Sequence, residues 1–152
     1  MSLKLNRRDA LALGGGAVAV AWGGVILPAV AAKNDAEELM KKFTGGKAAT
    51  EGRVRLDLPE IAENGNTVPM TVSVESPMNE QSYVSDVLVV ADENPRGGVV
   101  TFHFTPEGGV AEANVRIRLA ESQKVIAVAK MSDGSFFTAS KAVKVTIGGC
   151  GG

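Results

Sequence analysis

The sequence predicts an all-β protein: an immunoglobulin-like antiparallel β-sandwich of about seven strands, with a short N-terminal helix and a flexible C-terminal arm. Runs in which apolar and polar residues alternate predict half-buried strands through most of the chain. Turn-forming residues separate these runs, and no long helical period lies between them. Because apolar residues make up 45% of the 152 residues and aromatic residues only 5%, we expect a core of aliphatic side chains and a few phenylalanines.

The beginning of the chain has the pattern of an export signal. Basic residues, Lys4, Arg7 and Arg8, precede a charge-free stretch that ends in the small-x-small cleavage site Ala29-Val30-Ala31. The adjacent arginines match a twin-arginine signal, although Ala10 stands where that signal usually has a bulky apolar residue.

The export signal, the strand patterns and the glycine-rich end together divide the chain into three parts. We expect a cleaved signal peptide in residues 1–32, a folded domain in residues 33–147 and the arm in residues 148–152. The alternative for the first part is an uncleaved membrane helix, since about 20 apolar residues can span a bilayer. A twin-arginine signal predicts a protein located in the periplasm, without stable membrane insertion after cleavage.

A short helix is predicted directly after the signal. Asn34 is a suitable N-cap, Glu37 and Glu38 lie in the first turn, and Gly45-Gly46 ends the helix. Its apolar face consists of Leu39, Met40 and Phe43.

The predicted strands follow from residue 53 onward. Clear alternation occurs in residues 53–58, 68–75, 111–119 and 143–147. Further strands are expected within residues 83–91, 99–105, 124–131 and 136–139. Turn residues between them include Asn64-Gly65 and Asp133-Gly134, and the second pair is a strong hairpin signal.

Two of these strands are apolar on both faces, in residues 87–91 and 125–129. A sandwich core buries one face of each strand, so the other face needs a cover. Cover from within the chain, by the N-terminal helix or by neighbouring long side chains, and cover by a partner subunit are equally suitable.

Composition and motifs exclude several classes of function. Lys and Arg total 16 against 17 Asp and Glu, so no basic field indicates nucleic-acid binding. One histidine, His103, and one cysteine cannot supply a usual zinc or blue-copper site, and we predict no cofactor and no metal. A Cys–His nucleophile pair is disfavoured because a flexible tail fixes no geometry, so His103 is expected at the surface or an interface. The domain therefore has the character of a scaffold rather than of an enzyme.

The sequence ends in Gly148-Gly149-Cys150-Gly151-Gly152, which holds the single cysteine. Glycine is the most conformationally free residue, so this tail has the properties of a slim arm that presents one thiol. A frayed terminus with an incidental thiol is the alternative. Without a second cysteine the thiol stays free, pairs with another molecule or carries a group.

Together these features resemble the SoxY family, the sulfur-carrier subunits of the periplasmic thiosulfate-oxidising (Sox) system. The most specific match is the terminal Gly-Gly-Cys-Gly-Gly, reached through residues 143–147. The twin-arginine leader supports it, as do the stretches 59–65, 68–69, 116–119 and 125–134.

The resemblance implies that Cys150 is the covalent attachment site for sulfur and that Gly148, Gly149, Gly151 and Gly152 form a flexible arm. It also implies a heterodimer with SoxZ. Transient partners would be a c-type cytochrome, a dimanganese hydrolase that releases sulfate, and a sulfane dehydrogenase. The chain would then be a substrate of these enzymes, holding thiosulfonate and persulfide intermediates.

Two other functions remain open on the residues alone. A C-terminal Gly-Gly thiocarboxylate would use the carboxylate of Gly152, although export and the strand pattern argue against this. A structural periplasmic subunit would use Cys150 as a disulfide tether to a partner.

Overall fold

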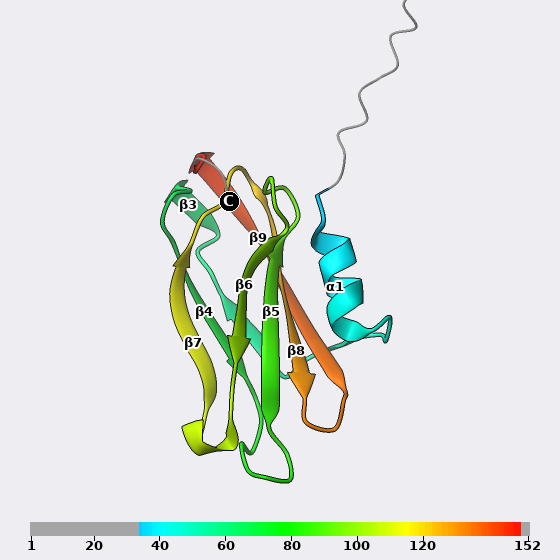
Figure 1. Ribbon diagram of the computed structural model, residues 1–152. Helices are drawn as coiled ribbons and strands as arrows, with labels where there is room; N and C mark the ends of the chain where they lie inside the picture. The colour runs from blue at the N-terminus through cyan, green and yellow to red at the C-terminus, as the bar shows by residue number, and fades with distance from the viewer. Residues whose placement is uncertain (1–33, 150–152) are drawn as a thin grey trace, which may run out of the picture. The chain divides into compact units, whose positions relative to one another are not determined.

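The computed structural model describes residues 34–149, which form two β-sheets and an α-helix (Figure 1). The predicted signal peptide, residues 1–32, lies outside the described residues, as do the last three residues of the predicted arm. Within residues 34–149, no helix is long and apolar enough to cross a bilayer.

Nine strands occur in the described part of the chain. The larger sheet has the order β1-β9-β8-β5-β6, with β3 pairing on β9, and the smaller sheet has the order β2-β4-β7. A 3-10 turn, η2 (Pro106–Gly108), joins β6 to β7. The strands are β1 (Thr50–Glu51), β2 (Val54–Asp57), β3 (Ile61–Asn64), β4 (Val68–Val74), β5 (Val84–Ala91), β6 (Gly98–His103), β7 (Ala111–Ile117), β8 (Gln123–Met131) and β9 (Phe136–Ile147).

The core lies between the two sheets. On β4, the central strand of the smaller sheet, every second residue is buried: Val68, Met70, Val72 and Val74. Side chains alternate between the faces of a strand, so all four point toward the larger sheet. There they meet the inward face of β5, whose Val87 and Val89 are fully buried in the same cluster. The predicted all-β sandwich is confirmed.

The helix α1 (Ala36–Thr44) covers the opposite face of the larger sheet. Leu88 and Val90, which alternate with the inward residues of β5, form a second cluster with Ala36 of the helix. The partly buried residues packed on this cluster are Leu39, Met40, Phe43 and Ile126. One of the two predicted covers, the helix, is therefore confirmed for these apolar strands.

The start of α1 differs from the prediction in one detail. The N-cap is Asp35 and not Asn34. The side-chain oxygen of Asn34 accepts the Ala36 N–H at 3.2 Å, and its amide nitrogen donates to the carbonyl oxygens of Ala91 and Asn94. Asn34 thus joins the helix to the end of β5, a long-range role that a capping pattern does not indicate.

Three strands also differ from the prediction. β9 is one strand of 12 residues where two short strands were expected, because Ser140 and Lys141 continue the backbone pairing with β8. β1 and β3 were not expected, since these short segments carry no clear alternation. Both β1 and β3 pair with β9 in parallel, so the larger sheet is mixed.

Candidate functional site: the root of the predicted arm

The structure describes two of the five residues of the predicted arm, Gly148 and Gly149. Cys150, Gly151 and Gly152 lie outside the described residues. Sulfur attachment at Cys150 and flexibility of the arm therefore stay predictions. The two described glycines show where the arm leaves the sandwich, directly after β9.

The parallel pairing of β3 with β9 brings a turn beside this point. Ala62 is in register with Val145, and Asn64 with Ile147. Gly65 extends the pairing by one step, because its N–H donates to the carbonyl oxygen of Ile147 at 2.7 Å. The Asn64-Gly65 turn, which the sequence predicts, thus lies next to the first residues of the arm.

We call Gly148 and Gly149 the arm root. Backbone hydrogen bonds form a closed ring that includes these two residues. The carbonyl oxygen of Gly65 accepts the N–H of Leu119 at 2.8 Å, and the carbonyl oxygen of Leu119 accepts the N–H of Gly149 at 2.9 Å. Since Gly65 also bonds to Ile147, the ring returns to the strand from which the arm starts. Leu119 is fully buried in the core, which fixes the acceptor that Gly149 uses.

The loop that carries Leu119 is itself held by a buried asparagine. Asn94, which is 3% exposed, donates to the carbonyl oxygen of Arg118 at 2.9 Å and accepts the N–H of Ala120 at 2.9 Å. Its oxygen also accepts a hydrogen bond of 2.8 Å from Gln123, another buried polar side chain. The sequence gives no sign of this contact, because Asn94 lies in the loop between β5 and β6, 24 residues before Arg118.

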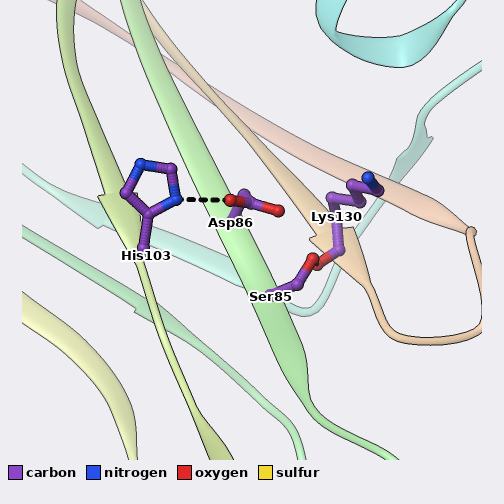
Figure 2. A network of polar contacts seen from close by, with 4 residues as sticks. All are labelled: Ser85, Asp86, His103 and Lys130. Carbon is purple, nitrogen blue, oxygen red and sulfur yellow. Dashed lines mark hydrogen bonds and ion pairs between the residues drawn. The ribbon is translucent and has the colours of Figure 1, made fainter.

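The histidine singled out in the sequence lies on a different surface. Figure 2 shows His103 of β6 facing Asp86 of β5, and the Nδ1 to Oδ1 distance is 2.5 Å. Beside them the hydroxyl of Ser85 donates to the backbone carbonyl of Lys130 at 3.2 Å. The His103 side chain is 76% exposed, which agrees with the predicted surface position. In residues 34–149 no three His, Cys, Asp or Glu side chains gather closely enough to hold a metal ion.

Two carboxyl groups with a lowered pKa also lie away from the ring. The side chain of Thr105 lowers the pKa of Glu107 by hydrogen bonding, and the hydroxyl of Ser135 does the same for Asp133. Asp133 belongs to the hairpin that precedes β9, whereas the arm follows the other end of that strand. The residues joined by the ring are Gly, Ile and Leu. Their side chains carry no acid–base group, so the ring contributes only backbone hydrogen bonds at the arm root.

Comparison with known proteins gives one family. The chain matches the family described as sulfur oxidation protein SoxY over residues 40–150. A solved structure with this fold is the sulfur carrier protein SoxY from Chlorobium limicola f thiosulfatophilum, with a TM-score of 0.61 and 26% identity. The alignment covers 71% of this chain and 89% of the carrier. No curated protein matches the chain.

Superoxide reductases share the fold at lower identity. The enzyme from Ignicoccus hospitalis, a neelaredoxin, has a TM-score of 0.57 and 17% identity, covering 62% of this chain and 80% of its own. The enzyme from Nanoarchaeum equitans has a TM-score of 0.54 and 14% identity, covering 64% of this chain and 100% of its own. These identities show a common sandwich and nothing about activity.

The family match is of a different kind, because it follows the sequence itself from within the helix through every strand to the cysteine of the predicted arm. Since it covers most of the chain, from Met40 to Cys150, the chain belongs to the SoxY family of sulfur oxidation proteins.

Proposed function

We propose that this chain is a covalent sulfur carrier of thiosulfate oxidation, with Cys150 as the attachment site. The observation that carries the proposal is the family match, which extends to Cys150. The similar structure from Chlorobium limicola f thiosulfatophilum is described as a sulfur carrier, which supports the same role. Cys150 is the single cysteine of the sequence, so all thiol chemistry of the chain falls on this residue.

The loading step is an oxidation. The thiolate sulfur of Cys150 bonds to the terminal sulfur of thiosulfate, and two electrons pass to a c-type cytochrome partner. The product is a thiosulfonate, in which Cys150 carries an S–SO₃⁻ group. The sequence places no cation next to Cys150, and a free thiol has a pKa of about 8.5. Activation of the thiol is therefore assigned to the partner's site.

The unloading step is a hydrolysis. Water attacks the sulfonate sulfur, sulfate leaves with release of two protons, and a persulfide anion stays on Cys150. A hydrolase with a dimanganese site would catalyse this step. A sulfane dehydrogenase would then oxidise the remaining sulfur with oxygen from water and pass the electrons to a cytochrome acceptor.

This division of work fits the described domain. The arm root is held through backbone hydrogen bonds among Ile147, Gly65, Leu119 and Gly149. In this proposal the chain acts as a substrate of its partners, as its membership of the SoxY family suggests. We assign it a stable heterodimer with SoxZ and a periplasmic location, reached through the twin-arginine pathway with cleavage of residues 1–32.

Intact-mass spectrometry tests the proposal. The full chain is incubated with thiosulfate and the cytochrome partner, and then with the hydrolase. We expect a thiosulfonate adduct that becomes a persulfide, and neither adduct in a Cys150→Ser variant. Detection of disulfides between proteins as the sole products would support the tether instead. Loss of loading on deletion of Gly152, with Cys150→Ser still active, would support a thiocarboxylate.

A further inference from the structure

The two glycines before Cys150 lie in a confined space. A Cβ atom on Gly148 would stand 2.1 Å from the carbonyl oxygen of Ala120, and one on Gly149 would stand 2.8 Å from that of Gly65. A Cβ atom on Gly65 would in turn stand 2.2 Å from the carbonyl oxygen of Leu119 and 2.7 Å from the nitrogen of Gly149. All of these neighbours are backbone atoms, which cannot move aside as a side chain can.

None of the three glycines has the left-handed backbone that favours glycine for conformational reasons. Close approach of backbone to backbone is therefore what these positions require. Gly149 is buried, and its N–H is satisfied by Leu119, whose side chain is anchored in the core. The receiving surface is also held in place independently of the arm, because Asn94 binds both Arg118 and Ala120.

We propose that Gly65, Gly148 and Gly149 form a glycine seat that anchors the root of the arm, with Gly65 as a positioning residue for Cys150. Gly148 and Gly149 then belong to the folded sandwich and not to the predicted flexible arm. This inference rests on the proposed function, since it assigns the seat the task of setting where the sulfur-bearing residue leaves the sandwich.

The glycine seat also implies two states of the arm, a shorter one with Gly148 and Gly149 attached to the sandwich and a longer one with both detached. When Gly148 and Gly149 detach, Cys150 gains a reach of about 7 Å, at about 3.3–3.6 Å for each extended residue. One backbone hydrogen bond favours the seated form by about fivefold to tenfold, so a partner enzyme that binds the extended arm can release it. The extended arm is thus a minor form, at about 10–20% of the population.

Solvent exchange of the Gly149 amide, measured by NMR on the full chain, tests the seat directly. We expect slower exchange than for an unstructured glycine. Gly65→Ala and Gly148→Ala should each raise the exchange rate about fivefold, because either methyl group prevents seating. Gly148 follows the last strand, so its variant keeps the sandwich folded even if Gly65→Ala does not.

Gly108→Ala is the matched control, because nothing lies within 4 Å of its added methyl group and its backbone is not left-handed. The Gly149 exchange rate should be unchanged in this variant. An unprotected Gly149 amide in the unmodified chain, or equal rates in the chain and in Gly148→Ala, would overturn the proposal.

A nitroxide spin label on Cys150 gives a second readout. With Gly149 seated, the label follows a fixed residue, so the lines of its electron paramagnetic resonance spectrum should be broad. In Gly148→Ala these lines should become narrower. Identical spectra in both proteins would show that the seat does not position Cys150. Neither measurement uses thiosulfate or the partner enzymes. Failed thiosulfate loading with a protected Gly149 would therefore count against the carrier function alone.

Discussion

Two segments of this molecule attach to the sandwich through a buried glycine, and they attach differently. At the helix, Gly97 approaches Ala36 so closely that a Cβ atom would stand 2.3 Å from the Ala36 nitrogen. At the arm root, Gly65 approaches Leu119 and Gly149 in the same manner. The helix adds apolar side chains that pack on β5 and β8, whereas the arm root adds no side chain.

The difference follows from what each segment does. Burial of apolar side chains contributes roughly 25 cal/mol for each Å² removed from water, so the helix attachment is persistent. The arm root depends on one hydrogen bond and on backbone contact, which together are weak enough to be released. A covering element needs the first kind of attachment, and a carrier arm is served by the second.

Asn94 links the two attachments, so its removal should have the largest effect. Its backbone oxygen accepts from Asn34 at the helix, and its side chain holds Arg118 and Ala120 at the arm root. In Asn94→Ala the part-buried N–H of Ala120 loses its acceptor and the carbonyl oxygen of Arg118 loses its donor, whereas the side-chain amide of Gln123 keeps its bond to the carbonyl oxygen of Glu121. We expect the free energy of unfolding to fall by about 3 kcal/mol, measured in urea, since each unsatisfied group costs about 1–3 kcal/mol.

The same variant should abolish protection of the Gly149 amide. Asn114→Ala is the control, because its hydrogen bonds to Thr71 and Glu112 lie at the surface, and we expect a change below about 0.5 kcal/mol. Equal stabilities of the two variants would contradict the role of the Asn94 side chain in holding the loop at the arm root.

Gly97→Ala tests the helix attachment alone. The new methyl group meets backbone atoms of Ala36, so the helix must shift, and we expect a loss of about 2 kcal/mol in the free energy of unfolding. Gly98→Ala is the neighbouring control, because its nearest contact is the flexible end of Leu39 at 3.0 Å. A Gly97→Ala variant as stable as Gly98→Ala would show that the close approach at the helix does not matter.

Phe43→Ala removes side-chain packing from the helix without touching its glycine contact. Phe43 is half-buried and meets Phe136 edge-on, with ring centroids 6.0 Å apart. We expect unfolding to become easier by about 1 kcal/mol, with unchanged exchange at the Gly149 amide. Gly149→Ala should give the opposite result: the amide of residue 149 should exchange faster, while the free energy of unfolding stays nearly constant. If both variants altered both readouts, the two attachments would not be independent.

The sequence allowed the fold and the cover of the sheet to be predicted, because both follow from local patterns. Period-two alternation marks β4, and the apolar residues on both faces of β5 are explained by the predicted helix. The arm was predicted from its composition. The glycine seat could not be, because Gly65 and Gly149 meet through β3, whose pairing with β9 leaves no trace in the hydrophobic pattern. Glycine at a turn also has the same appearance in a sequence as glycine at a close contact.

The smallest effect on stability is expected for a substitution in the hairpin between β8 and β9, which is remote from the glycine seat. The hydroxyl and the N–H of Ser135 both donate to Asp133, which lowers the pKa of this exposed carboxyl group. Ser135→Ala removes the larger cause, so the pKa of Asp133 should rise toward its usual value while the N–H bond keeps part of the shift. An NMR titration of the carboxyl carbon measures this.

The pKa of Asp133 is lower in the folded state, so its contribution to stability is present above the unfolded pKa and is lost as pH falls through the folded pKa. Ser135→Ala should therefore be slightly less stable than the unmodified chain near neutral pH and equal to it at strongly acid pH. Protection of Gly149 and packing of the helix should not change at either pH. A change in Gly149 exchange would show that the hairpin communicates with the arm root along β9, and the two attachments would then not be local features.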